Sequence, residues 1–181
     1  MNEQIDLSEL IVDLNSTEEL IRATAYTVLV EQGAEAATEL VGMFPQISRP
    51  ARLHVIRALG EIGHPVASPL LSDLVRTEDP QEYLFVSSLA AKALGQIGDV
   101  DALLALLADE RGGPRRMAAT VLGNMAHPAA VPHLKHALRH EDPPMQKIAA
   151  KALGRIGTPE AIAAVDAWRT GRGRETKTAT L

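Results

Sequence analysis

Three histidines in the C-terminal half have a spacing that could bind a metal ion or sense pH. His133, His136 and His140 follow one another at three and four residues, with Glu141 directly after them. On a helix this spacing puts the imidazoles on one stripe, and neutral imidazole is a ligand for Zn²⁺. His133 and His140 are two turns apart, about 10 Å, so one ion cannot bind both without help. At most two histidines could share a metal, and the alternatives are a pH-sensitive contact surface or an ordinary solvated face.

A second group of charged residues surrounds a glycine-rich turn. Arg111, Arg115 and Arg116 flank Gly112-Gly113-Pro114. They could bind an acidic group, or they form a solvated basic corner. The turn lacks the Lys-Ser/Thr signature of a phosphate loop, and the chain has neither a cysteine nor a nucleophile elbow. We therefore expect no catalytic residues, no cofactor and no metal, and we favour a noncatalytic protein while leaving the question of enzyme activity open.

A repeated hexapeptide shows which elements position these residues. Ala-Leu-Gly-x-Ile-Gly occurs at 58–63, 93–98 and 152–157, with a degenerate copy at 121–126. Around each copy, apolar residues recur at i, i+3, i+4, i+7, i+8 and i+11, which is typical of one buried face of an α-helix. The repetition predicts a stack of helical hairpins. The earliest copy, at 21–32, matches the pattern less closely, as expected for a terminal repeat.

The two glycines of the hexapeptide have different expected roles. The first glycine lies inside a helix, where it costs about 1 kcal/mol relative to alanine, so we expect another helix to approach it closely within each hairpin. These glycines are Gly60, Gly95, Gly123 and Gly154. The second glycine is expected to end the helix in a left-handed conformation, and Ala126 replaces it in one copy. Asp99 and Thr158 then follow as caps of the next helix.

These signals predict five hairpins in one domain that covers residues 1–170. The expected hairpins are at about 17–45, 49–76, 80–109, 113–140 and 143–170, after a short helix near 7–14. The residues after 170 are rich in Gly, Thr, Arg and Lys, which is typical of disorder, so we expect a disordered tail at 171–181.

The second helix of the third hairpin is apolar on every side over 102–108. Leu104, Ala105 and Ala108 should therefore lie outside the repeat's own core and form a contact patch with a polar rim. The alternative is that neighbouring second helices bury this strip. The predicted binding residues are Ser68, Ser72, Asp73, Leu104, Ala105, Ala108, His133, His136 and His140.

Composition limits the classes of partner. The net charge is −5, which opposes the phosphates of nucleic acids, so nucleic acid is not an expected partner. The first ten residues carry acids where a signal peptide needs basic residues, and no apolar run approaches the ~18 residues of a membrane span. We expect a cytoplasmic protein that does not cross a membrane.

The extended pattern Ala-x-Ala-Leu-Gly-x-Ile-Gly, then Asp or Thr-Pro, then an amphipathic helix ending in Glu-Asp-Pro, resembles bacterial HEAT-like repeats of the short phycobilin lyase type. The resemblance covers about residues 17–170. It implies an all-α, right-handed α-solenoid with the first helices on the convex side and the second helices on the concave side. Binding is then expected on the second helices. The same repeat occurs in scaffolds, adaptors, lyase subunits and a metal-dependent hydroxylase.

The hydroxylase branch of this family holds two irons with His-Glu pairs at the start of several first helices. The corresponding pairs here are Leu53-His54, Ser88-Leu89, Arg116-Met117 and Lys147-Ile148. None is His-Glu, so that activity is not expected. His54 occupies a position that Leu, Met or Ile fills in the other copies, which predicts a partly buried, hydrogen-bonded histidine.

Two functions follow from the resemblance and the residues. The first is a noncatalytic protein–protein interaction scaffold or adaptor that binds a protein partner on the concave face. The alternative is a phycobilin lyase-type subunit or chaperone that binds a tetrapyrrole, with histidine and arginine on the propionates and the apolar strip on the rings. A contact patch also fits a second copy, so a homodimer is a further alternative.

Overall fold

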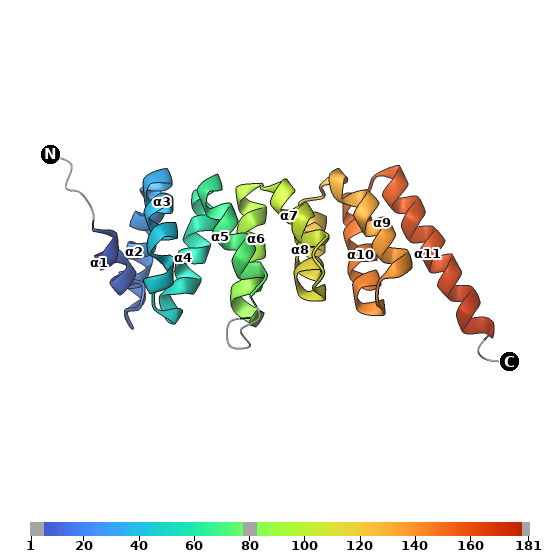
Figure 1. Ribbon diagram of the computed structural model, residues 1–181, viewed down its shortest axis with the longest axis horizontal. Coiled ribbons are helices and arrows are strands. Elements are labelled where there is room, and N and C mark those ends of the chain that lie inside the picture. Colours follow the sequence, from blue (N-terminus) through green and yellow to red (C-terminus); the bar gives the residue numbers. More distant parts are fainter. Residues whose placement is uncertain (1–5, 78–82, 179–181) are drawn as a thin grey trace. The chain divides into compact units, whose positions relative to one another are not determined.

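The computed structural model describes residues 6–77 and 83–178, with the backbone alone at 83–84 and 172–178. Every regular element within these ranges is a helix, which confirms the predicted all-α class (Figure 1). The chain divides into two compact units, Met1–Ala102 and Leu103–Leu181, called the N-terminal and C-terminal units. In the described ranges, no helix combines the length and hydropathy needed to span a bilayer.

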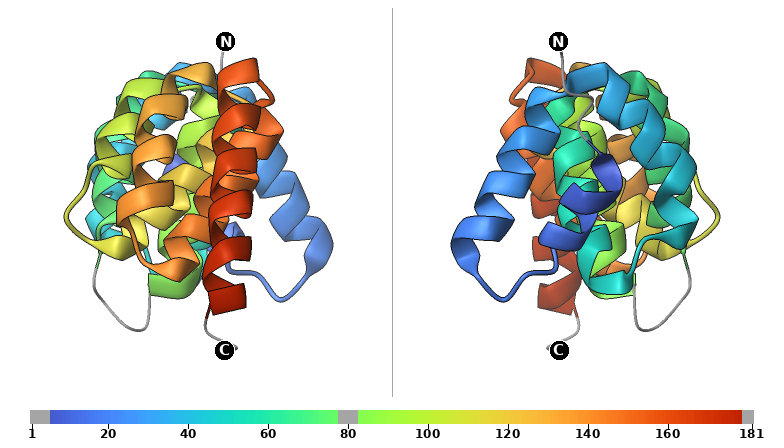
Figure 2. Two further views of the ribbon diagram at one scale, coloured as in Figure 1. Left: turned by 90° about the vertical axis from the view of Figure 1, so that its right-hand side faces the viewer. Right: turned by 90° about the vertical axis from the view of Figure 1, so that its left-hand side faces the viewer.

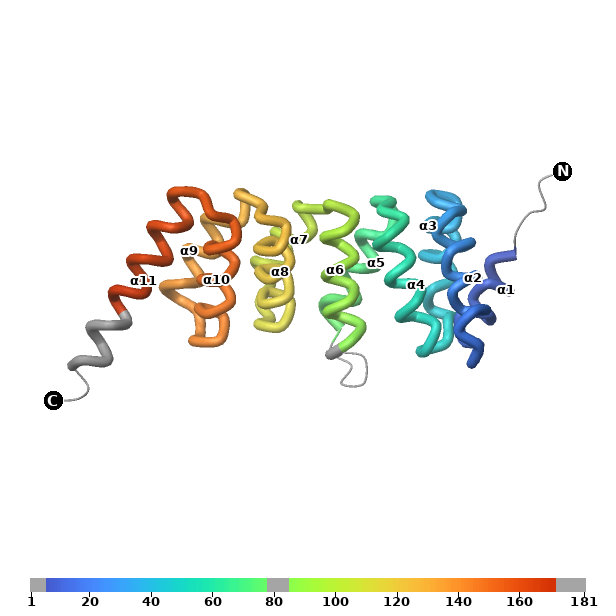
Figure 3. The backbone as a smooth tube through the Cα atoms, turned by 180° about the vertical axis from the view of Figure 1, so that it is seen from behind, coloured from blue at the N-terminus to red at the C-terminus, as the bar shows by residue number. Residues whose placement is uncertain are grey.

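The N-terminal unit consists of a short leading helix and helices paired as hairpins. Its helices are α1 (Leu7–Asp13), α2 (Glu19–Glu31), α3 (Gly33–Met43), α4 (Arg49–Ile62), α5 (Ser68–Val75) and α6 (Ser88–Ile97). A π-helical turn, Tyr83–Ser87, leads into α6. Helix α4 packs against α2, α3 and α6, and α1 packs against α2 (Figure 3). The first helices therefore stack directly on one another.

The C-terminal unit repeats this arrangement and ends in a long second helix of 20 residues, α11. Helix α7 (Val100–Leu107) contains the boundary between the units, and α8 (Gly112–Asn124), α9 (Val131–His140), α10 (Pro143–Ile156) and α11 (Pro159–Thr178) follow. Helix α10 packs against α8, α9 and α11, and α11 also lies beside α9 (Figure 2). Second helices α9 and α11 thus share one side of the unit.

Helices α2–α3, α4–α5, α8–α9 and α10–α11 occupy residues 19–43, 49–75, 112–140 and 143–178. Helix α11 continues to Thr178, where the sequence predicts a disordered tail from residue 171. Extending a formed helix needs no new nucleus, so polar residues can continue it. Residues 179–181 lie outside the described part of the chain, and the single-domain organisation stays a prediction.

The apolar stripe of the repeat is buried at some of its predicted positions and half-buried at others, such as Leu89, Met117 and Ile148. In α10, Met145, Ala149 and Leu153 are at most 2% exposed, and the matching positions of α4, α6 and α8 are also buried. The terminal copy differs, because Ile21 and Thr24 of α2 are exposed. This exposure agrees with the poorer match of the first copy to the repeat pattern, because no preceding hairpin covers it.

The buried glycines allow close packing between successive first helices, not within a hairpin as the sequence suggested. A methyl group on Gly60 of α4 would lie 2.8 Å from the Cβ of Ala93 on α6. One on Gly123 of α8 would lie 2.6 Å from the Cβ of Ala152 on α10. The prediction of a close approach is right and the partner helix was wrong, because the stripe faces the next repeat as well as its own second helix. Gly154 has no atom within 4 Å of such a methyl group.

The turns of the hairpins use the predicted caps. Gly63, Gly98 and Gly157 end their helices with φ between 68° and 81°. Ala126 adopts φ 52°, so it holds the same left-handed conformation without the freedom of glycine. The side chain of Asp99 accepts the backbone N–H of Ala102 at 2.9 Å, and Thr158 and Asp142 cap α11 and α10 in the same way.

Candidate functional site

The predicted binding residues fall in both units. Ser68, Ser72 and Asp73 belong to α5 of the N-terminal unit, and the other six belong to the C-terminal unit. Asp73 is exposed and lies 4.0 Å from Arg76, while Ser72 is half-buried. The six residues of the C-terminal unit lie on or next to its second helices and are treated as one candidate site.

Ser68 is not a surface residue, contrary to the prediction. It is 7% exposed, and its hydroxyl has no hydrogen-bond partner among the described residues. Counted from the repeat's second glycine, Ser68 occupies the position that Leu103 and Val131 hold in later hairpins, and both are buried. Ser68 therefore lies on the buried face of α5 together with Leu71 and Val75, and it is no longer part of the candidate surface.

The apolar strip of α7 is only partly covered. Leu104 is half-buried, and Ala105 and Ala108 are exposed. Leu103 and Leu106 on the opposite face of the helix are fully buried. The face that the sequence placed outside the core thus remains accessible at its two alanines.

Helix α9 separates an apolar face from a basic one. Leu134, Ala137 and Leu138 are buried against the unit. Apart from Pro132 at the start of the helix, the side chains that face away from this core are all basic or titratable, and α9 itself carries no acid. We call these residues the α9 basic face: His133, Lys135, His136, Arg139 and His140. Of them Lys135 is half-buried and the others are exposed.

A hollow of about 350 Å³ lies beside α9, next to the connector between α7 and α8. Leu107, Ala137 and Met145 line it and are buried, whereas His133 and His136 line it from the exposed face of α9. Ala108, Arg115 and Glu141 also line it. We call it the Arg115 hollow. Three of the predicted binding residues, Ala108, His133 and His136, thus meet at one cavity.

Arg115 of this hollow is bonded to Glu141 and to the connector, although its Nε has no partner among the described atoms. Nη1 of Arg115 donates to the carbonyl oxygens of Asp109 and Glu110 at 2.8 and 2.7 Å, and Nη2 pairs with Oε2 of Glu141 at 3.0 Å. Arg111 pairs with Asp109 at 2.8 Å, and Arg116 lies 3.8 Å from Asp142. The three arginines therefore brace the connector and the next turn, in place of the anion site or solvated corner expected from the sequence.

The histidine stripe lies as predicted on one face of α9. The rings of His136 and His140 are 4.6 Å apart between centroids, and His140 lies beyond the hollow. In the described part of the chain, no three histidine, aspartate or glutamate side chains are close enough to hold a metal ion together. His133, His136 and His140 are all exposed on α9.

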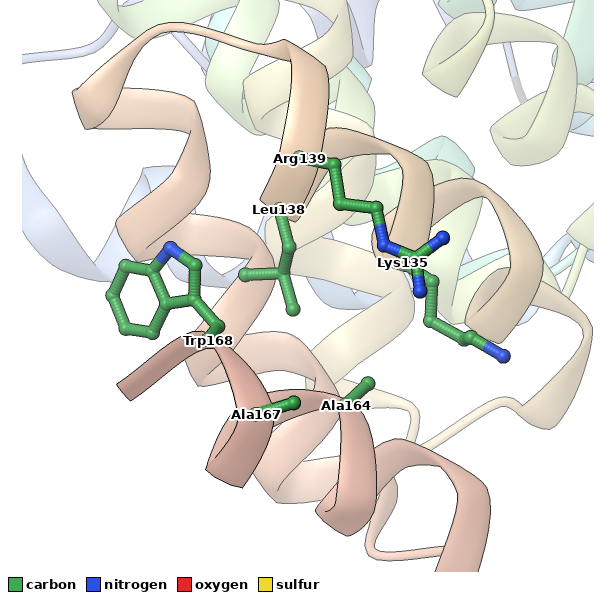
Figure 4. Close-up of a pocket in the computed structure, with 6 residues that line it drawn as sticks. All are labelled: Lys135, Leu138, Arg139, Ala164, Ala167 and Trp168. Atoms are coloured by element: carbon green, nitrogen blue, oxygen red, sulfur yellow. The ribbon is translucent and has the colours of Figure 1, made fainter. Parts of the chain in front are cut away.

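A second hollow, of about 200 Å³, lies on the other flank of α9, where it meets α11. Figure 4 shows Trp168, Ala164 and Ala167 of α11 opposite Leu138, Lys135 and Arg139 of α9. We call it the Trp168 hollow. Leu138 is buried, Trp168 is half-buried, and Arg139 is exposed. Lys135 is ion-paired with Glu160. The hollow therefore has an apolar floor with cationic side chains at its edge.

The charge of the chain is divided unequally between the units. Residues 103–181 contain 12 lysines and arginines and 7 acids, a formal charge of +5. Residues 1–102 contain 6 and 16, a formal charge of −10. The net charge of −5 used in the sequence analysis conceals this division, and the candidate site lies on the basic unit.

A different polar cluster lies on the first helices of the N-terminal unit. The hydroxyl of Tyr26 donates to Oε2 of Glu61 at 2.6 Å, and the guanidinium of Arg57 lies 5.4 Å from the Tyr26 ring. Burial, then this hydrogen bond and the charge of Glu61, raise the pKa of Tyr26 to about 12. Burial, then the charges of Arg57 and Arg22, lower the pKa of His54. His54 is half-buried as predicted, but it has no hydrogen bond among the described residues.

Sequence reasoning missed Lys135, Arg139 and Trp168. The interpretation of α9 considered its histidines alone, although Lys135 and Arg139 share the same exposed face. Trp168 is the one tryptophan of the chain, and it stands at the repeat position that Ala137 fills in α9. Taking all exposed residues of α9 together would have added Lys135 and Arg139 to the histidines, whereas the hollow itself depends on how α9 and α11 pack.

Solved structures similar to this chain are helical repeat proteins. The complex of CpcE and CpcF of phycocyanin lyase from Nostoc sp. PCC7120 is 23% identical, covers 87% of this chain and 68% of that chain, and has a TM-score of 0.51. An engineered protein is 22% identical over 92% of this chain and 86% of its own, with a TM-score of 0.45. A designed armadillo repeat protein is 17% identical over 90% and 88%, also with a TM-score of 0.45. At these identities the likeness concerns the fold.

The family comparison is more specific. No curated protein matches the chain in sequence. The model of HEAT repeats matches residues 46–113 and 100–181, which together make up most of the chain. The hairpins α4–α5, α8–α9 and α10–α11 lie within these matches. The protein therefore belongs to the family of HEAT repeats.

Proposed function

We propose that this protein is a noncatalytic scaffold or adaptor that binds a partner protein through the second helices of its C-terminal unit. The observation that carries the proposal is the surface around α9, where the basic face lies between two hollows with apolar floors. An apolar centre with a polar rim is the usual anatomy of a protein contact. HEAT repeats form such binding surfaces from stacked helices.

The chemistry of the Arg115 hollow favours binding over catalysis. Its arginine and glutamate are paired with each other and with the connector backbone, so they hold the hollow open. Both side chains are 22% exposed, which leaves them little room to meet a substrate. His133 and His136 stand at the rim, where they can contact a partner.

Site-specific photocrosslinking in the source cells tests this function. A crosslinking residue placed at His136 of α9 or Ala167 of α11 should give the same discrete adduct. Matched positions are Thr120 of α8 and Lys151 of α10, which are also exposed but lie on first helices. Adducts of equal yield at all four positions, or none at His136 and Ala167, would contradict the proposed function.

A further inference from the structure

We infer that copies of this protein associate head to tail, with α2 of one copy packed on α10 and α11 of the next. The inference goes beyond the proposed function, because it concerns a different face of the C-terminal unit. It follows from the repeat positions that each of the two faces leaves uncovered and from the opposite charges of the helices that carry them. The occupant of each face is a second copy of this chain.

Helix α10 leaves uncovered two positions that α8 buries. Ala150 is half-buried and Gly154 is exposed. Ala119 and Gly123 hold the same repeat positions in α8, and both are buried where α10 packs against that helix. No atom lies within 4 Å of a methyl group placed on Gly154. The side of α10 that would receive a further first helix is therefore open among the described residues.

Helix α11 continues this open side with an apolar residue. Ile162 is 49% exposed, whereas Val131 at the same position of α9 is 3% exposed. We call the uncovered residues of the two helices the α10–α11 face: Ala150, Gly154 and Ile162. This face is separate from the surface around α9, because its residues line neither the Arg115 hollow nor the Trp168 hollow.

Helix α2 of the N-terminal unit leaves the opposite side of a first helix uncovered. Ile21 and Thr24 are exposed and Val28 is half-buried. Counted from the second glycine of the repeat, Ile21 corresponds to Ala51 of α4 and Met145 of α10, which are both buried. Helix α1 packs against α2 but leaves Ile21 and Thr24 exposed. We call Ile21, Thr24 and Val28 the α2 face.

The contact that would join the two faces already occurs inside each unit. In the C-terminal unit, Ala152 of α10 lies against Gly123 of α8. Val28 holds the position of Ala152 in α2, and Gly154 holds the position of Gly123 in α10. Valine also occupies this position in α8, as Val121. Because the missing neighbour of α10 is a first helix of this repeat, α2 of a second copy supplies it.

The helices that carry the two faces have opposite charges. Residues 7–31, which form α1 and α2, contain five acids and one arginine, a formal charge of −4. Residues 143–178, which form α10 and α11, contain seven lysines and arginines and three acids, a formal charge of +4. Opposite charges favour the approach of unlike faces and oppose that of like faces. The association is therefore head to tail, and not a symmetric dimer of one face with itself.

Sedimentation equilibrium of the full chain measures this association. We expect the average mass to rise with protein concentration beyond that of a dimer, because a head-to-tail contact leaves one open face at each end of the assembly. The association should weaken as salt is added, since the two faces attract one another by charge.

Two variants block one face each. Ile21→Lys alters the α2 face and Ile162→Glu alters the α10–α11 face, and each variant alone should associate at least about tenfold more weakly. A mixture of the two variants still contains one intact face of each kind, so it should form a one-to-one heterodimer and nothing larger. This mixture distinguishes a head-to-tail contact from a symmetric one.

A matched control separates these faces from general apolar attraction. Phe85 is an exposed large apolar residue outside both faces, and Phe85→Lys should change the association by less than about twofold. Circular dichroism verifies that each variant folds. If Ile21→Lys or Ile162→Glu fails to fold, Thr24→Lys and Gly154→Glu block the same faces at exposed helical positions.

Three results would overturn the inference: a wild-type protein that stays monomeric up to about 1 mM, a dimer that persists unchanged in either variant, or a mixture of variants that does not form a heterodimer. Photocrosslinks at His136 and Ala167 test the proposed function separately, because an adduct with a partner protein differs in mass from one with a second copy.

Discussion

The two units of this protein share one packing rule and differ in the surface built on it. In each unit a glycine of one first helix receives an alanine of the next, Gly60 with Ala93 and Gly123 with Ala152. The N-terminal unit carries a formal charge of −10 and the C-terminal unit +5. Small buried residues therefore define the repeat, whereas exposed residues on the second helices distinguish the units. We therefore expect function to depend on the exposed residues of the second helices.

The largest expected effect tests the shared packing rule. Gly60→Ala and Gly123→Ala each place a methyl group less than 3 Å from the next helix, so each should cost about 2–3 kcal/mol of stability. Denaturant unfolding measures the loss. Gly154→Ala is the matched control, and it should gain about 0.5–1 kcal/mol because nothing lies within 4 Å. A large loss for one glycine alone would show that the units differ in packing as well as in charge.

The next effect separates a structural arginine from a binding one within the C-terminal unit. Arg115→Met removes the ion pair with Glu141 and two bonds to carbonyls, and should cost about 2 kcal/mol. Arg139→Met, at an exposed site, should change stability by less than about 0.5 kcal/mol and act on partner binding alone. Thermal unfolding of both variants decides the matter. Equal stabilities would mean that Arg115 does not brace the connector.

The turn at Ala126 gives a smaller effect of opposite sign. Its left-handed conformation, φ 52°, costs alanine about 1 kcal/mol, whereas Gly63 holds the equivalent turn of the N-terminal unit without that cost. Ala126→Gly should raise stability by about 0.5–1 kcal/mol in denaturant unfolding. Gly63→Ala is the reciprocal change and should lower stability by a similar amount. A loss on Ala126→Gly would contradict the assigned backbone strain.

The smallest effect concerns pH and the N-terminal unit. Because burial and the charges of Arg57 and Arg22 lower the pKa of His54 in the folded state, the unfolded chain takes up this proton first as pH falls. The contribution of neutral His54 to stability is complete above the pKa that His54 has in the unfolded chain. It is lost as pH falls toward the lower pKa of His54 in the folded state. His54→Leu uses the residue found at this repeat position in α6. The stability of wild type relative to this variant should fall between pH 7.5 and 5, and a constant difference would rule out the shift.

The repeat could be predicted from the sequence, and the surface only in part. The glycine pattern and the apolar spacing indicate the hairpins, because each position of the repeat recurs in several copies and one irregular copy can be compared with the others. Ser68 shows the limit: its second helix is short, and the stripe of leucines drawn through Leu70 and Leu74 placed it on the wrong face. Comparison with Leu103 and Val131 at the same repeat position would have corrected it.

The Trp168 hollow could not be predicted, because it depends on how α9 and α11 pack. The sequence shows Ala164 and Ala167 near Trp168, but not that Leu138 lies across from them. The opposite charges of the units could be counted in the sequence only once their boundary was known. The histidine stripe could be predicted from spacing alone. Lys135 and Arg139 share its face of α9, so the stripe is part of a larger basic surface.

The most direct measurement is the yield of in-cell photocrosslinks at four exposed positions of the C-terminal unit. Our interpretation predicts one discrete adduct at His136 of α9 and at Ala167 of α11, and much lower yields at Thr120 of α8 and Lys151 of α10. Equal yields at all four positions, or no adduct on α9 and α11, would contradict it.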